Sequence, residues 1–126
     1  MEEQSLAEET ELATDARALD RLKRFGGGKL LEEMIALFLS VAPERMATAR
    51  QAHEARDLPT LERAMHSLKG SAAQLGALRL QRLSGEGERL ARLETLGGVP
   101  ILMQKLDEEL ARVREWLIKP RDEGSR

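Results

Sequence analysis

The sequence contains no cysteine and no tyrosine, and its only aromatic residues are Phe25, Phe38 and Trp116. Without cysteine, the chain cannot form disulfides, zinc–thiolate sites, iron–sulfur clusters or a thiol nucleophile. β-Branched residues are also few, and strands are usually rich in β-branched and aromatic residues. The apolar residues are mainly Leu, Ala and Met, which favour helices. The composition therefore predicts an all-α protein.

Long apolar runs and a strong excess of one charge are missing as well. No apolar run approaches the roughly 20 residues of a membrane span. The first residues are acidic and lack the charged-then-apolar pattern of a signal peptide. The net charge of −2 gives no general attraction to nucleic acid or to a membrane surface. We therefore expect a cytoplasmic protein, a monomer, that binds neither nucleic acid nor membrane.

The two ends of the chain differ in composition from the part between them. Residues 1–13 contain five Glu and no basic residue, which predicts a flexible acidic leader. Thr14 or Asp15 can cap a short first helix, which the glycines at 26–28 would end. Residues 120–126 form a polar tail, because a proline at its start ends the last helix.

Apolar periodicity predicts longer helices through the middle of the chain. Proline disfavours helix at the residue before it but suits the first turn of a helix, so Pro43 predicts either a break or a bend. Short connections make successive helices antiparallel. We therefore expect an antiparallel up-down four-helix bundle over residues 14–119, with short N-terminal helical additions. The predicted helices cover residues 29–41, 43–56, 58–75, 78–96 and 100–119.

One of these helices combines an exposed histidine with an unexpected glycine. Its apolar stripe is formed by Leu61, Met65, Leu68, Ala72 and Leu75. His66 lies roughly 140° from the centre of that stripe, and Gly70 lies nearly opposite it. An exposed glycine inside a helix costs about 1 kcal/mol relative to Ala. The pattern indicates that another molecule approaches the backbone closely beside His66.

The residues around His66 suit phosphoryl chemistry. Histidine side chains in water titrate at about pH 6.5, so an exposed imidazole is mostly neutral at physiological pH, and its free ring nitrogen is a nucleophile. Lys69 is a neighbour on the helix surface and can place its ammonium near phosphoryl oxygens. His53, by contrast, has no motif around it and is interpreted as a partly buried structural histidine. No spacing of His and Glu predicts a metal site.

The turn near Ala77 predicts which residues of the next helix face His66. In an antiparallel hairpin, residues whose numbers sum to about 154 then lie side by side, which pairs His66 with Glu88 and Glu62 with Arg92. Residues 62–92 hold six basic and three acidic residues, a net charge of +3. This basic rim would suit an acidic or phosphorylated partner. The candidates for a second wall of the site are Glu88, Arg89 and Arg92.

At this point the sequence resembles a known family. The stretch Ala64-Met65-His66-Ser67-Leu68-Lys69-Gly70-Ser71-Ala72 is similar to the signature of histidine-containing phosphotransfer (HPt) domains, in which His is followed after two residues by Lys-Gly-Ser or Lys-Gly-Ala. The similarity extends over residues 15–118. It implies a four-helix bundle in which His66 is phosphorylated at Nε2, Lys69 aids the phosphoryl group and Gly70 gives access. It also makes Ser71 and Gln74 candidates for docking.

The resemblance implies a function and its partners. The chain would accept a phosphoryl group on His66 from a receiver-domain aspartate and relay it to another response regulator receiver. The partners would be receiver domains, a hybrid histidine kinase, or both. No cofactor is expected in this chain, because Mg²⁺ would belong to the receiver's acidic pocket. No glycine-rich ATP loop is present, so we expect a phosphocarrier without autokinase activity rather than an enzyme.

Two other functions stay open at this stage. The chain could be a substrate domain that a chemotaxis-type kinase phosphorylates directly, or a helical adaptor that binds partners without phosphotransfer. The sequence also departs from the family pattern. Gly28 stands where many members have Asp, and Ser84 lies near a common cysteine. Gly85 and Gly87 lie within a predicted helix, and we expect Gly87 to admit a bulky neighbour such as Trp116.

Overall fold

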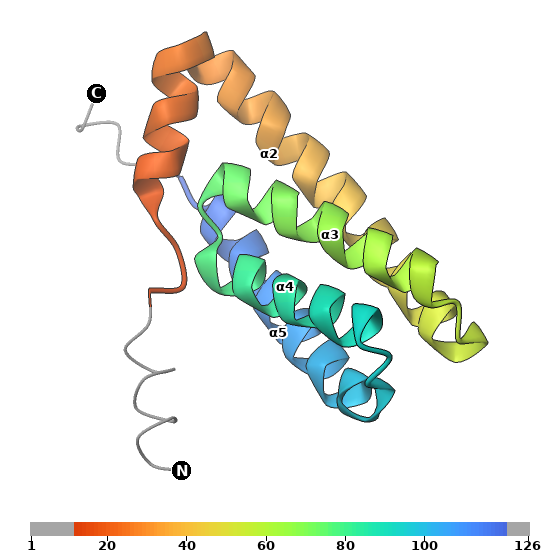
Figure 1. The fold of residues 1–126 in the computed structure, drawn as a ribbon. Coiled ribbons are helices and arrows are strands. Elements are labelled where there is room, and N and C mark those ends of the chain that lie inside the picture. The colour runs from red at the N-terminus through yellow and green to blue at the C-terminus, as the bar shows by residue number, and fades with distance from the viewer. Residues whose placement is uncertain (1–11, 121–126) are drawn as a thin grey trace.

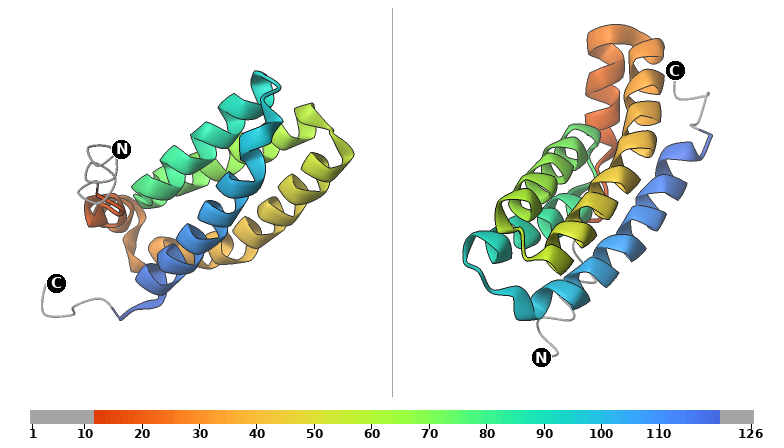
Figure 2. Two further views of the ribbon diagram at one scale, coloured as in Figure 1. Left: turned by 90° about the horizontal axis from the view of Figure 1, so that it is seen from below. Right: turned by 90° about the vertical axis from the view of Figure 1, so that its right-hand side faces the viewer.

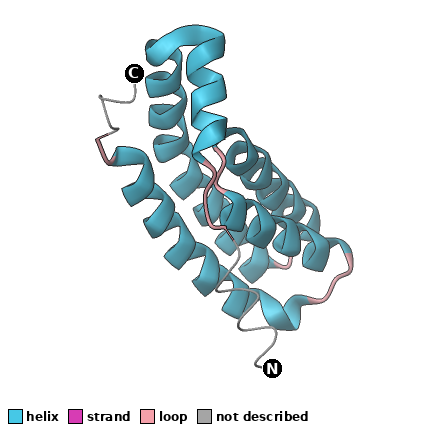
Figure 3. Ribbon diagram, turned by 90° about the vertical axis from the view of Figure 1, so that its left-hand side faces the viewer, coloured by secondary structure: helices cyan, strands magenta, loops and turns pink. Residues whose placement is uncertain are grey.

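The computed structural model describes residues 12–120, and all of its regular structure is helical. Figure 1 shows the helices, and Figure 3 shows that only short loops join them. The expected all-α class is confirmed. Residues 1–11 of the predicted leader and residues 121–126 of the predicted tail lie outside the described part. The elements are α2 (Ala16–Ala55), α3 (Leu58–Leu75), α4 (Leu78–Arg92), the 3₁₀ turn η1 (Leu96–Gly98) and α5 (Val99–Ile118).

The helices pack in a closed order, as the predicted bundle requires. Contacts join α2 to α3, α3 to α4, α4 to α5 and α5 back to α2. The further views in Figure 2 show these helices running side by side. The apolar stripe of α3 is buried throughout, and its partners from the other helices complete one core. The largest fully buried apolar side chains are Met46, Leu61, Met65, Leu68, Leu75, Leu80, Leu106, Val113 and Leu117.

Helix α3 begins and ends where its sequence predicts. The Asp57 side chain accepts a hydrogen bond from the backbone N–H of Thr60 at 3.3 Å, which satisfies one of the free donors of the first turn. At the other end, Gly76 adopts a left-handed conformation with φ of 76° and its N–H returns to the last carbonyls of the helix. Glycine is the residue for which this conformation costs least. These two caps fix the length of the helix that carries His66.

Gly27 divides α2 into an N-terminal arm (residues 16–26) and a long second part. Its φ of 86° and ψ of 174° are not helical, and Figure 1 shows the arm meeting the rest of α2 at a sharp corner. The segment before the arm is bonded to the α3–α4 turn, because Asp15 N donates to Gly76 O at 2.8 Å and Arg79 N donates to Ala13 O at 3.1 Å. A glycine turn at this point was expected, but the close contact with the α3–α4 turn was not.

Three further expectations need correction. Helix α2 continues through Pro43 without a break, because proline removes only one donor and the buried residues Ala42 and Met46 hold both sides of it against the core. Helix α4 ends at Arg92 rather than at residue 96. There, Glu94 takes a φ of 57° and Thr95 N donates to Leu90 O at 2.9 Å.

The third correction concerns Gly87. A Cβ at this position would lie 2.6 Å from Sδ of Met65 and 3.4 Å from a methyl group of Leu102. The bulky neighbour that the glycine admits is therefore Met65 and not Trp116. The glycine allows α4 to approach α3 closely behind the histidine. Among residues 12–120, no helix is long and apolar enough to span a membrane.

Candidate functional site

His66 lies on the outer surface of α3, opposite the buried stripe of that helix. Its side chain is 69% exposed. A Cβ added to Gly70, four residues further on, would meet no atom within 4 Å. The surface next to the imidazole is therefore open to an approaching molecule. The structure places both residues as the helical wheel predicts.

Glu88 of α4 joins His66 to Lys69. One carboxylate oxygen, Oε2, lies 2.7 Å from Nδ1 of His66, and the other, Oε1, accepts a hydrogen bond from Nζ of Lys69 at 2.5 Å. Glu88 is only 6% exposed, so the carboxylate is anchored while the imidazole above it is accessible. When Nδ1 carries the proton it donates to Glu88, and Nε2 then keeps its lone pair.

Arg92 extends this network along α4. Its Nη2 donates to Oε2 of Glu88 at 3.2 Å, and its Nε donates to Oε2 of Glu62 at 3.0 Å. The predicted hairpin register is confirmed, because His66 meets Glu88 and Glu62 meets Arg92. The third candidate for this wall, Arg89, instead pairs with Glu86 on its own helix and does not reach the histidine.

Charge on Glu88 is favoured by these neighbours. The hydrogen bond from Lys69 is the main cause that lowers the pKa of Glu88 below its ordinary value, and the bond to His66 lowers it further, while burial acts in the opposite direction. The carboxylate therefore stays ionised at neutral pH and accepts hydrogen bonds from both neighbours. The result is a fixed anion next to Nδ1 of His66.

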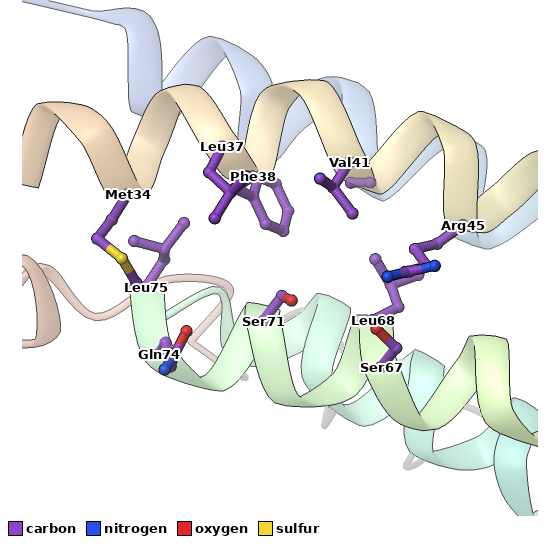
Figure 4. A pocket seen from close by; sticks show the side chains of 11 residues that line it. Met34, Leu37, Phe38, Val41, Arg45, Ser67, Leu68, Ser71, Gln74 and Leu75 are labelled. Carbon is purple, nitrogen blue, oxygen red and sulfur yellow. The ribbon is translucent and has the colours of Figure 1, made fainter.

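Ser71 and Gln74 lie on the side of α3 that faces α2, away from the Glu88 network of α4. Together with part of α2 they line a groove of about 300 Å³, the α2–α3 groove. Figure 4 shows its side chains, with Met34 and Leu75 at one end and Arg45 and Ser67 at the other. Its full lining is Met34, Leu37, Phe38, Val41, Ala42, Arg45, Ser67, Leu68, Ser71, Gln74 and Leu75.

The α2 wall of this groove was missed at the sequence level. The signal was an apolar face of α2 wider than the core needs. Leu37, a large apolar residue, is 58% exposed, while its neighbour Phe38 is buried. His66 thus lies on a ridge, with the Glu88 network of α4 on one side and the groove on the other.

The other predicted structural features can be placed as well. His53 is half-buried on α2, in agreement with a structural role, and its carbonyl accepts a hydrogen bond from Arg56 N at 3.1 Å. Ser84 is buried, and its Oγ has no hydrogen-bond partner. Residues 12–120 bring together no group of three or more His, Asp or Glu side chains that could hold a metal ion.

Comparisons with known proteins agree with this geometry. The Hpt domain family matches residues 33–116. The fold is similar to the crystal structure of histidine-containing phosphotransfer protein B (HptB) from Pseudomonas aeruginosa PAO1, with a TM-score of 0.80 and 27% identity over 86% of this chain and 93% of that chain. A comparison with curated proteins found no match. The chain belongs to the Hpt domain family, whose members are phosphocarrier modules of phosphorelays.

Proposed function

We propose that this chain accepts a phosphoryl group from a receiver-domain aspartate on Nε2 of His66 and passes it to another receiver. The observation that carries the proposal is the 2.7 Å contact between Nδ1 of His66 and Glu88. A proton held at Nδ1 by a carboxylate leaves the outer nitrogen as the nucleophile. Among residues 12–120, no side chain forms a hydrogen bond with Nε2 that would occupy its lone pair.

The transfer step needs no cofactor in this chain. Nε2 attacks the phosphorus of the aspartyl phosphate, a P–N bond forms, and the P–O bond breaks with its electron pair going to the aspartate carboxylate. The imidazole becomes a phosphoimidazolium, and its positive charge lies against Glu88. In the forward relay, the carboxylate of a second receiver attacks the same phosphorus and the electron pair returns to Nε2.

Lys69 and Gly70 serve the same step. The ammonium of Lys69 lies beside the imidazole, held by Glu88, where it can stabilise equatorial phosphoryl oxygens as charge moves. The open surface at Gly70 leaves room for the loops around a receiver's aspartate. We propose that Mg²⁺ is supplied by the acidic pocket of that receiver and not by this chain.

The α2–α3 groove provides a surface on which the partner can dock. It is apolar over most of its length and lies next to His66 on the same helix. An exposed leucine such as Leu37 is a suitable contact for a protein partner. Docking on this groove would place the receiver over the ridge that carries the imidazole.

The test is radiolabelled transfer from a panel of phosphorylated receiver domains. We expect wild type and His53→Gln, the matched histidine control, to acquire an acid-labile and base-stable label. His66→Gln should acquire none. Equal labelling of His66→Gln and wild type would overturn the proposal. Labelling of His66 only by a kinase with ATP would identify the chain as a direct kinase substrate, and a function that survives His66→Gln would identify an adaptor.

A further inference from the structure

The cations near His66 differ in whether the fold already pairs them. Lys69 and Arg92 are both bonded to Glu88. Arg45 of α2 and Arg63 of α3 form no ion pair with any of residues 12–120 and are both exposed. The hydrogen bonds from Thr60 and, after them, the charge of Arg63 lower the pKa of Asp57, but Arg63 makes no ion pair with Asp57. Both arginines can therefore form ion pairs with an approaching anion.

These two arginines share a pocket of about 300 Å³ between α2 and α3, the arginine pocket. Nη2 of Arg63 donates to Oγ1 of Thr60 at 3.2 Å, which orients the guanidinium and leaves its other N–H groups without a partner within the described part of the chain. Hydroxyl groups can donate to an anion as well. The pocket is lined by Arg45, Thr48, Thr60, Arg63, Ala64 and Ser67.

The arginine pocket continues the α2–α3 groove. Arg45 and Ser67 line both, and Figure 4 shows them together at one end of the groove. The surface therefore changes along its length from apolar to cationic and hydroxyl-lined. The cationic end lies next to the histidine in sequence, since Ser67 directly follows His66.

We infer that Arg45 and Arg63 hold a carboxylate side chain of the receiver that docks on the groove. The inference rests on the proposed function and adds the chemistry by which the partner is recognised. An arginine fork matches a carboxylate with two parallel hydrogen bonds, and the adjacent hydroxyls complete its coordination. The apolar groove gives contact area, and the arginines fix which partner docks and in which register.

The test compares two labelling reactions of the double variant Arg45→Glu/Arg63→Glu. One reports whether the variant is folded and reactive, and the other reports whether it docks on the receiver. The small donor phosphoramidate needs no docking surface, so His66 of the double variant should be labelled at the wild-type rate. Transfer from the receiver that labels wild type fastest should instead need about tenfold more receiver for half-maximal rate. Arg24→Glu, which reverses an exposed arginine on the N-terminal arm that forms no ion pair with any of residues 12–120, is the matched control and should behave as wild type.

Salt and charge exchange complete the experiment. Wild-type transfer should slow as salt rises from about 0.05 to about 0.5 M, since exposed charges are screened, and the double variant should lose most of that dependence. Lysine substitutions at acidic surface residues of the receiver should include one that restores transfer to Arg63→Glu. The inference is wrong if the double variant and wild type show the same transfer rate from the receiver at every salt concentration. It is also wrong if sedimentation shows that wild type is a dimer and that the double variant is a monomer. Failure of phosphoramidate to label His66 would instead count against the proposed function.

Discussion

Among single residues, Glu88 determines the state of the imidazole, because its carboxylate is the partner of Nδ1. Glu88→Ala removes that acceptor, so the proton of His66 should redistribute between Nδ1 and Nε2, and transfer from a receiver should fall about tenfold or more. Imidazole ¹⁵N chemical shifts measure the tautomers directly. Glu86→Ala is the control, since Glu86 pairs with Arg89 and not with the histidine. Unchanged shifts in Glu88→Ala would show that another group sets the tautomer.

The same residue predicts a pH dependence of stability. Lys69 and His66 lower the pKa of Glu88 in the folded protein, so its stabilising effect is complete above the ordinary glutamate pKa and is lost as the pH falls through the lowered value. The free energy of unfolding of wild type should therefore exceed that of Glu88→Gln at pH 7, and the gap should narrow at about pH 3. Urea unfolding at both pH values measures it. A gap that widens in acid would contradict the assigned direction.

A substitution at Gly70 can separate the approach of the partner from the reactivity of His66. Gly70→Gln places a side chain on the open surface beside His66, where a Cβ meets nothing, so folding should be unaffected. Transfer from a receiver should slow by about tenfold or more because the partner can no longer approach, whereas labelling by phosphoramidate should not change. The two labelling rates provide the measurement. Equal slowing in both reactions would assign Gly70 a role in the chemistry itself.

At the scale of helices, the two glycines of α4 have opposite surroundings. A Cβ at Gly87 would collide with the buried Met65, whereas a Cβ at Gly85 would make ordinary contact with Lys69 at 3.4 Å. Gly87→Leu should lower the free energy of unfolding by about 1–3 kcal/mol through overpacking. Gly85→Ala should raise it by up to about 1 kcal/mol through helix propensity. Denaturant unfolding measures both changes in the free energy of unfolding. Equal free energies for Gly87→Leu and wild type would refute the close packing of α4 on α3.

At the scale of the whole molecule, the N-terminal arm closes the bundle over the α3–α4 turn. Leu19 is buried in the core although it lies in the arm. Leu19→Ala should therefore lower the free energy of unfolding by about 2 kcal/mol or more while leaving receiver transfer unchanged, because neither His66 nor the groove touches Leu19. Calorimetry and the labelling reaction measure the two effects. Leu12→Ala, at a residue that is largely exposed, should change neither.

Local sequence patterns predicted the main helices, the caps of α3 and the register between α3 and α4. Apolar periodicity and capping residues determine the first two, and the short turn determines the third. These patterns also placed Glu88 beside His66. They left open whether the helix breaks or bends at Pro43, and they did not predict that α4 would end at Arg92 or that Met65 would fill the space at Gly87. Each of these depends on packing between distant segments, which overrides local preference. Arg89 was predicted to lie beside His66, but its long side chain turns along α4 and pairs with Glu86.

The ion pairs around His66 set how the surface changes when the residue is modified. Lys69 and Arg92 are balanced by Glu88 and Glu62, so these four side chains together carry no net charge. On the phosphoimidazolium proposed above, the phosphoryl oxygens carry about two negative charges and the ring offsets about one of them, while Lys69 and Arg92 are already paired with carboxylates. The proposed modification would therefore make the surface around His66 more negative by about one charge. If the proposed function holds, the phosphorylated form would be repelled by an acidic receiver pocket without Mg²⁺ and would favour a pocket that holds it, so dissociation of the two proteins after transfer would depend on the metal bound to the partner.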